Sequence, residues 1–249
     1  MAGYNEAFAR FYDSLTEDVD YGAKADFLLN IAGRFKDRCE LVLDLACGTG
    51  SLALELSRRG KEVIAVDGSP EMLARAMEKS AGAQPAILYL CQDMEELDLY
   101  GTVDLSICML DSLNHVEGRE RLREVFRRVA LFTEPGGLFL FDANTPYKHS
   151  RVLADSTFVY DEENFYCVWQ NDYNPQDGSV DIGLDFFVSQ GNDRYRRFRE
   201  EFREYCYSTQ EMAGMAEEAG FQVLEMLGDY RMEPPGREEQ RVVYVTRKK

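Results

Sequence analysis

The sequence is short of histidine, of closely spaced cysteines and of long apolar runs. Its 249 residues include only 2 histidines and 6 cysteines, and no two cysteines form a C-x-x-C pair. Zinc and iron–sulfur sites need clustered thiolate or imidazole ligands, so we expect no metal centre. The cysteines on apolar runs are expected to pack as small hydrophobic side chains.

Positive charge is also scarce. The chain has 28 lysines and arginines against 45 aspartates and glutamates, a net charge of −17, which opposes binding to a polyanion. No apolar run approaches the roughly 20 residues that a membrane-spanning helix needs. The first residues, MAGYNEAFARFYD, lack the charged start and apolar centre of a signal peptide. The sequence therefore predicts a cytoplasmic protein with neither a membrane nor a nucleic-acid partner.

Between residues 41 and 144, short apolar runs alternate with longer amphipathic ones. Helices are expected to begin near Ser51, Pro70 and Gly118, and Ser69 is a good N-cap for the second of them. Strands that are apolar on both faces and separated by helices are typical of a parallel sheet covered on both sides. The candidate strands are LVLDLA, EVIAVD, AILYLCQD, VDLSICML and GLFLFDAN.

The pattern changes after Pro146. Aromatic-rich segments with alternating polarity are separated by the turn sequences NPQDGS and QGND, which predicts an inserted antiparallel meander. A helix over STQEMAGMAEEAGF follows, and then two strands joined by MEPPGREE. This connection is too short for a parallel crossover, so we expect the last two strands to pair antiparallel.

The glycine loop between the first strand and its helix predicts a ligand site. Gly48 and Gly50 let a ligand approach the backbone closely, and in such sheets the crevice lies beyond the carboxyl ends of the strands. A dinucleotide loop has a third glycine where Ala53 stands, a substitution that such loops tolerate. Asp44 would repel a pyrophosphate and suits an ammonium group, while Asp67 can accept both hydroxyls of a ribose. An adenosine with a cationic amino-acid tail meets both requirements.

Together these residues resemble the signature of a known protein family. The series VLDLACGTG, Asp67 and CQDMEEL resembles the signature of class I S-adenosylmethionine-dependent methyltransferases, over residues 41–144 and the final helix and strands. The resemblance implies a Rossmann-like α/β fold, with a seven-stranded mostly parallel sheet whose last strand is antiparallel. Residues 1–146 and 208–249 would form the cofactor domain with an N-terminal helical cap. Residues 147–207 would form a β flap that covers a substrate or makes a homodimer.

The resemblance also implies roles for single residues. Tyr12 and Tyr21 would fold over the cofactor's carboxylate, Met72 would pack on its adenine, Asp93 would accept from the adenine amino group, and Met94 would supply a backbone contact. Ordinary helix packing is the alternative for Met72 and the two tyrosines. The full set of expected S-adenosyl-L-methionine contacts is Tyr12, Tyr21, Asp44, Ala46, Gly48, Gly50, Asp67, Met72, Gln92, Asp93, Met94 and Leu110.

Polar residues after the fourth strand are candidates for the acceptor side. Asp111, Asn114 and His115 lie in MLDSLNHV, at the expected mouth of the crevice. His115 is the expected catalytic base, since the ordinary pKa of a histidine is about 6.5; a helix cap or surface position is the alternative. His149 would line the other wall, and Trp169 would cover the acceptor.

The sequence thus predicts a methyltransferase that acts on a small-molecule acceptor by N- or O-methylation. A protein acceptor, a nicotinamide-dependent oxidoreductase and a non-catalytic cofactor-binding module remain alternatives. The inserted segment is similar to the flap of an uncharacterised bacterial subgroup, which carries a histidine where Phe202 stands. Any role of that histidine is therefore not transferred to this chain.

Overall fold

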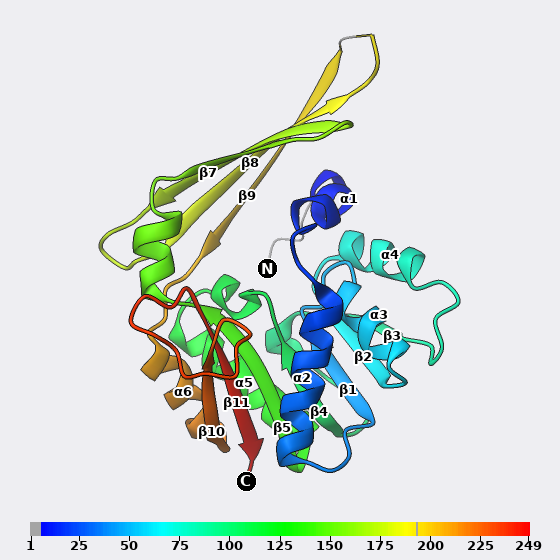
Figure 1. The fold of residues 1–249 in the computed structure, drawn as a ribbon, viewed down its shortest axis with the longest axis vertical. Helices are drawn as coiled ribbons and strands as arrows, with labels where there is room; N and C mark the ends of the chain where they lie inside the picture. Colours follow the sequence, from blue (N-terminus) through cyan, green and yellow to red (C-terminus); the bar gives the residue numbers. More distant parts are fainter. Residues whose placement is uncertain (1–5, 193) are drawn as a thin grey trace.

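The computed structural model describes residues 6–192 and 194–249, which form two β-sheets with a helix between them (Figure 1). The larger sheet has seven strands in the order β10-β11-β5-β4-β1-β2-β3. Its strands are β1 (Leu41–Leu45), β2 (Glu62–Asp67), β3 (Leu88–Cys91), β4 (Val103–Cys108), β5 (Thr133–Asn144), β10 (Phe221–Gly228) and β11 (Arg241–Lys248). β1 to β5 pair in parallel, and β11 pairs antiparallel with both β5 and β10.

Helices cover both faces of the larger sheet. One apolar cluster joins it to α2 and α3, and another joins it to α5 and α6. Start signals in the sequence act as expected: Ser69 caps α4 through its side chain, and Ser208 forms a capping box with Glu211 at α6. The helices are α1 (Glu6–Leu15), α2 (Tyr21–Phe35), α3 (Ser51–Arg58), α4 (Pro70–Lys79), α5 (Arg119–Phe132) and α6 (Thr209–Glu218), with short turns η1 (Met94–Glu96), η2 (Ser112–His115) and η3 (Lys148–Leu153).

The smaller sheet is an antiparallel meander in the order β6-β7-β8-β9. Its strands are β6 (Thr157–Asp161), β7 (Phe165–Tyr173), β8 (Val180–Ser189) and β9 (Tyr195–Glu204). Alternate residues of β8 are buried, and this apolar face packs against α1. The ring of Phe11 lies 4.6 Å from that of Phe165 and 5.9 Å from that of Phe186, between centroids. Helix α1 therefore fills the space under the smaller sheet (Figure 1).

A buried asparagine ties the two sheets together. Asn114, in η2, accepts from the backbone amide of Asn144 at 2.9 Å and donates to the carbonyl of Tyr205 at 3.0 Å. Asn144 ends β5 and Tyr205 follows β9, so one side chain holds the chain both where it leaves the larger sheet and where it returns. The sequence prediction gave Asn114 an acceptor-binding role, but this side chain is fully buried and structural.

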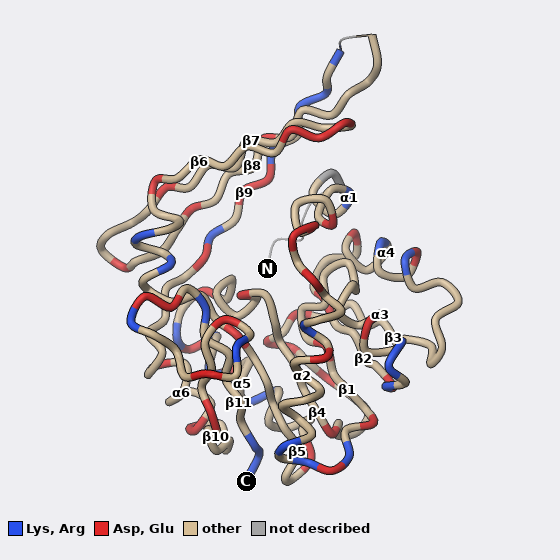
Figure 2. The backbone as a smooth tube through the Cα atoms, viewed as in Figure 1, with Lys and Arg blue, Asp and Glu red and all other residues tan. Residues whose placement is uncertain are grey.

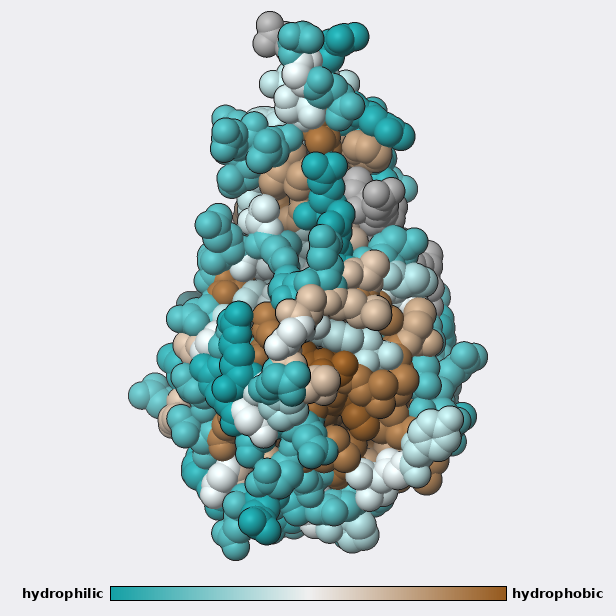
Figure 3. Space-filling model, turned by 90° about the vertical axis from the view of Figure 1, so that its right-hand side faces the viewer, coloured by the Kyte–Doolittle hydropathy of each residue, from teal (hydrophilic) through white to brown (hydrophobic). Residues whose placement is uncertain are grey.

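The surface carries both charge signs and one apolar edge. Acidic and basic residues are interspersed over both sheets (Figure 2). Apolar side chains gather on the side of the larger sheet where edge strand β3 lies (Figure 3), with Leu88 53% and Met77 59% exposed. Within the part of the chain that the structure describes, no helix has both the length and the apolarity to cross a membrane.

The architecture confirms the predicted fold class, including the antiparallel last strand and the inserted meander. One strand is shorter than predicted: β3 is limited to Leu88–Cys91, within the expected AILYLCQD. The predicted roles of the two parts, a cofactor domain at residues 1–146 and 208–249 and a substrate or dimer flap at residues 147–207, stay predictions.

Candidate cofactor and acceptor site

A cavity of about 650 Å³ lies where the carboxyl ends of the parallel strands face α1, α2 and the smaller sheet. It is continuous in its lining with a narrower pocket over the β1 loop, since Tyr12, Ala46, Gly48 and Leu110 line both. A crevice at this edge is the usual ligand position in an open α/β sheet. We call these the large cavity and the β1 pocket.

The two glycines of the β1 loop have different roles. Both adopt left-handed backbone angles, with φ of 55° at Gly48 and 72° at Gly50. A Cβ at Gly50 would lie 2.8 Å from that of Ala76, so this glycine permits α3 and α4 to pack closely. A Cβ at Gly48 would meet only the ring of Tyr12, at 3.9 Å. Gly48 therefore leaves the β1 pocket open, whereas Gly50 lines neither pocket.

Asp67 organises the loop around the cavity. Its carboxylate, only 9% exposed, accepts from the backbone amides of Gly48 and Ser69, both at 2.8 Å. Burial raises the pKa of Asp67, and these two amides oppose the rise. The side chain fixes the ends of β1 and β2 relative to one another and still lines the large cavity.

Asp44 presents an unusual buried carboxylate. It is 3% exposed, and its Oδ2 has no hydrogen-bond partner among the described residues. Burial, and then the charge of Asp67, raise the pKa of Asp44 to about 7, against a backbone hydrogen bond from Ala53. Because the residue lines the β1 pocket, a cationic group bound there would satisfy the free oxygen.

A strained turn connects the β1 pocket with the rest of the cavity. Leu110 and Asp111 are both left-handed, with φ of 57° and 54°, and such residues cost about 1–3 kcal/mol each. Buried Asp142 holds them: its carboxylate accepts from the amide of Leu110 at 3.0 Å and from that of Asp111 at 2.6 Å. Tyr230 also donates its hydroxyl to Asp142, at 2.7 Å. The turn thereby aims Asp111 into the large cavity.

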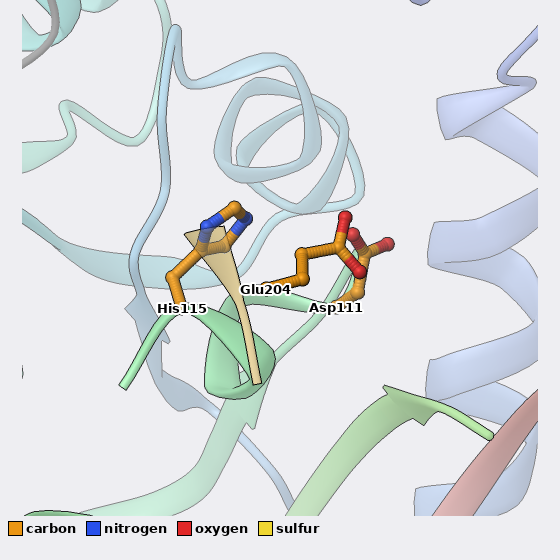
Figure 4. Close-up of side chains that lie close together, drawn as sticks. All are labelled: Asp111, His115 and Glu204. Atoms are coloured by element: carbon orange, nitrogen blue, oxygen red, sulfur yellow. The ribbon is translucent and has the colours of Figure 1, made fainter. Parts of the chain in front are cut away.

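Three ionisable groups converge on one wall of the large cavity (Figure 4). Asp111, His115 and Glu204 each offer a ligand atom, and these atoms lie within 4.8 Å of one another. Asp111 is ion-paired with Arg241. Burial alone would raise the pKa of Asp111, but Arg241, and then Lys148, hold it below its usual range. The cluster thus combines the ion pair of Asp111 and Arg241 with the separate carboxylate of Glu204.

Glu204 is held from behind by a chain of hydrogen bonds. Asn144 donates to its Oε2 at 2.8 Å, and Lys148 donates to the other end of that amide at 3.0 Å. His149 Nε2 lies 3.3 Å from the same carboxylate oxygen, while its Nδ1 is 2.9 Å from the carbonyl of Gly178. Nε2 of His149 is a buried polar atom that has no hydrogen-bond partner among the described residues, although it faces Glu204.

The cluster of Asp111, His115 and Glu204 has side chains that can bind a cation. An aspartate, a histidine and a glutamate can ligate a divalent metal. Here, however, Asp111 already pairs with Arg241, and Lys148 adds a second positive charge nearby. Lys24, which also lines the cavity, is a third positive side chain facing the carboxylates of Asp111, Asp142 and Glu204. A dication would meet these positive charges, so the cluster suits a singly charged ammonium better than a divalent metal.

The structure separates the remaining expected site residues into two groups. His115, Met72, Met94 and Trp169 line the large cavity, and Tyr21 lines the β1 pocket. Four residues line neither pocket, for reasons that differ. Gln92 bonds to the backbone of Asp98, Asp93 caps η1, Asn114 joins the two sheets, and His149 lies fully buried behind Glu204.

Comparisons with known proteins identify the family. The chain is 32% identical over 244 residues to a putative methyltransferase of Geobacillus sp. (strain WCH70), covering 98% of this chain and 99% of that one. A crystal structure of an S-adenosylmethionine-dependent methyltransferase from Clostridium acetobutylicum ATCC 824 matches with a TM-score of 0.87 and 32% identity, covering 97% and 98% of the two chains. The chain belongs to the class I S-adenosylmethionine-dependent methyltransferases.

Two further findings agree with this assignment. A family described as "Methyltransferase domain" matches residues 42–137 of this methyltransferase. A glycine/sarcosine N-methyltransferase of Parasynechococcus marenigrum (strain WH8102) is 30% identical over 237 residues, covering 92% of this chain and 79% of that one. The nicotinamide-dependent and non-catalytic alternatives are therefore set aside.

The chain's own residues fit S-adenosylmethionine, the cofactor of this family. The unpartnered Oδ2 of Asp44 suits the ammonium group of its amino-acid end, and Gly48 leaves the β1 pocket open for that end. Asp67 stands at the end of β2, where an acidic side chain takes a ribose. The individual contacts stay predictions.

Several cavity residues have no signal in the sequence. They come from α2, η3, β9, the loop after β10 and β11, and none belongs to a motif: Lys24, Lys148, Glu204, Tyr230 and Arg241. Phe202 is the one cavity residue of this kind that the sequence singled out, because it stands where the similar subgroup carries a histidine. The centroid of its ring lies 5.3 Å from that of His115.

Proposed function

We propose that this methyltransferase acts on the nitrogen of a small-molecule amine. The observation that carries the proposal is the convergence of Asp111, His115 and Glu204 on one wall of the large cavity. A protonated amine is attracted by carboxylates, and among the described residues Glu204 makes no ion pair with a lysine or arginine, whereas Asp111 pairs with Arg241. Neutral acceptors such as phenols gain nothing from that charge.

An amine must lose its proton before it can act as a nucleophile. Glu204 and His115 are the two groups near the attracted nitrogen that can accept this proton. His115 lines the large cavity together with Asp67, so it faces the same space as the end where the cofactor is expected. When bound, S-adenosylmethionine supplies an electrophilic methyl group on a sulfonium sulfur.

The surrounding elements hold the reactants and exclude water. The turn at Leu110 and Asp111 is fixed by Asp142, which gives the acceptor wall a defined position relative to the β1 pocket. Tyr160, Trp169 and Phe202, from the smaller sheet, cover the cavity opposite the parallel strands. An apolar cover of this kind strengthens electrostatic contacts inside the cavity.

Relatives support the same acceptor class. The name of the Parasynechococcus marenigrum relative assigns it amino-acid amines as acceptors. The size of the cavity, about 650 Å³, and the net charge of −17 favour a small molecule over a nucleic acid. We keep homodimer formation through residues 147–207 as a separate proposal, to be tested by light scattering.

The test is a panel of acceptors of three classes: primary amines, phenols and carboxylates. The purified protein is incubated with S-adenosylmethionine and each compound, and products are identified by mass spectrometry. Asp67→Ala, which is expected to bind the cofactor poorly, is the negative control. We expect methylation on nitrogen. Methylation confined to phenols or carboxylates would contradict the proposal. Once an amine acceptor is found, the pH–rate profiles of His115→Asn and Glu204→Gln are compared with wild type. The substitution that removes the proton acceptor should shift the profile, and the other should not.

A further inference from the structure

Two lysines in the large cavity lack the acidic partners that are abundant in this acidic chain. Lys24, on α2, and Lys148, on η3, both line the cavity. Among the described residues, neither ammonium has a carboxylate oxygen within 4.0 Å. By contrast, Arg241, the third cation of the cavity, pairs with Asp111. The cavity therefore contains positive charge that the folded chain does not neutralise by direct contact.

Lys24 is positioned by an aromatic ring. Its Nζ lies 3.1 Å from the ring centroid of Tyr230, whose hydroxyl is fixed on Asp142. Burial, and then the charge of Arg241, lower the pKa of Lys24 to about 8, which leaves most of the side chain charged at neutral pH. Asp142, Asp229 and Asp111 oppose this fall in pKa without a direct ion pair, and a bound anion would supply the direct contact that this half-buried ammonium lacks.

Lys148 is positioned by an amide. Its ammonium donates to Asn144 at 3.0 Å, and among the described residues this is its one hydrogen bond. An ammonium has three N–H donors, so two remain for a ligand. Asn144 in turn donates to Glu204. Lys148 and the carboxylate of Glu204 are thereby held at the two ends of one side chain, a short distance apart.

The cavity is thus bipolar, with an acidic wall at Glu204 and basic groups beside it. We propose that Lys24 and Lys148 form an oxyanion subsite, so that the acceptor is an amine that also carries a carboxylate or a phosphate. This inference rests on the proposed function for the amine end, whereas the oxyanion end rests on the two lysines alone. Charge-assisted hydrogen bonds to the anion would orient the nitrogen toward Glu204 and His115.

The experiment measures anion binding directly and does not need the true acceptor. Protein saturated with S-adenosylhomocysteine is titrated by calorimetry with inorganic phosphate, with acetate and with methylammonium chloride as the amine-only probe. The variants are Lys24→Met and Lys148→Met, which keep an apolar stem of similar length. Lys61→Met is the matched control, because Lys61 lines neither pocket.

We expect the wild type and Lys61→Met to bind phosphate or acetate in the millimolar range, and each cavity variant to bind about tenfold more weakly. Preference for phosphate indicates a phosphorylated acceptor, and preference for acetate indicates an amino acid. Equal anion affinity in all four proteins would overturn the proposal, as would the absence of anion binding to the wild type. The proposal would also fail if Lys24→Met lowered the affinity for S-adenosylhomocysteine itself, since the lysine would then be part of the cofactor site.

The two proposals can fail separately. Loss of lysine-dependent anion binding with methylation of simple amines intact removes only the oxyanion subsite. Lysine-dependent anion binding without methylation of any amine in the panel removes only the amine assignment. Unchanged affinity for S-adenosylhomocysteine and an unchanged circular dichroism spectrum show that the variants are folded.

Discussion

The proposed cofactor side of the cavity, around the β1 loop, and the proposed acceptor side, around Glu204, are built in different ways. Around the β1 loop, Asp44, Gly48, Asp67 and Ser69 lie within one strand–helix–strand segment, and backbone amides make most of the contacts. Across the cavity, Lys24, Glu204 and Arg241 come from α2, β9 and β11. Local chain geometry can therefore specify the cofactor side, whereas the acceptor side depends on long-range packing.

The two sides also differ in how their charges are balanced. On the cofactor side, Asp44 keeps an unpaired oxygen and Asp67 is satisfied by amides, so both charges are left for a ligand. On the acceptor side, Asp111 and Arg241 neutralise each other, and the groups left for a ligand are Glu204 and the two lysines. Variants on one side should therefore leave binding on the other side unchanged, which can be tested.

Asp67→Ala is expected to have the largest effect. The change removes the contact to a ribose and also the acceptor for the amides of Gly48 and Ser69, so the β1 loop loses its order. We expect affinity for S-adenosylhomocysteine to fall by about 100-fold or more, in keeping with the cost of unpaired buried groups. Calorimetry measures this. An affinity within threefold of wild type would show that Asp67 is not the main polar contact.

Asp44→Asn should weaken cofactor binding less and remove its pH dependence. Because the pKa of Asp44 is raised to about 7, its carboxylate charges only near neutral pH. Wild-type affinity for S-adenosylhomocysteine should fall by about tenfold for each pH unit below that value, while the variant's affinity stays flat. A wild-type affinity that is equal at pH 5.5 and pH 8 would exclude the predicted ammonium contact.

The same residue predicts a stability change in the unliganded protein. A carboxyl group whose pKa is raised on folding, here from 3.8 to about 7, stabilises the fold below its unfolded value and loses that contribution as pH rises through 7. Relative to Asp44→Asn, the wild type should therefore lose thermal stability between pH 4 and pH 7. Melting curves of the two proteins across that range measure the difference, and parallel curves would contradict it.

Glu204→Gln tests the acceptor side. With an amine acceptor, we expect kcat to fall by about 10- to 100-fold, the usual range for a proton-accepting group or its charge, with cofactor affinity unchanged. Glu201→Gln is the matched control, since Glu201 is exposed on the same strand, pairs with Arg199 and does not line the large cavity. Equal activity of the two variants would remove Glu204 from the acceptor site.

Trp169→Leu should have the smallest effect. The indole lines the large cavity and donates to Asn171 at 2.6 Å, so its loss opens the cover without touching the charged groups. We expect KM for the acceptor to rise by a few-fold, with kcat and cofactor affinity near wild type, because a partly covered cavity loses only apolar contact area. Tyr166→Leu, on the opposite face of β7, serves as control. A large fall in kcat would show that Trp169 does more than cover the cavity.

Much of the fold was predictable because its signals are local. The apolar runs, the N-cap at Ser69 and the turn sequences of the insertion each act over a few residues, and the structure has the expected elements there. The cofactor loop was predictable for the same reason. The different roles of Gly48 and Gly50 were not, since the close approach of α4 to Gly50 is a packing result.

The residues of the proposed acceptor wall were predicted only in part. Asp111, His115 and Trp169 line the cavity as expected, but Asn114 and His149 are buried behind it. Both are polar residues near strand ends, where sequence position does not reveal whether a side chain points toward the cavity or into the protein. Glu204 has no motif, and its role follows from Asn144 and His149, which belong to another part of the chain.

By itself, the sequence determined the order of strands and helices, the β1 loop with Asp44 and Asp67, and thereby the cofactor, because turns, caps and apolar periodicity act between near neighbours. The tertiary structure alone decided the acceptor wall. It brings Lys24 of α2 and Arg241 of β11 to one cavity and sets Glu204 beside Asp111. The physical reason is that such pairs exist only after distant strands have packed, and their charges are balanced by contacts that no local pattern encodes.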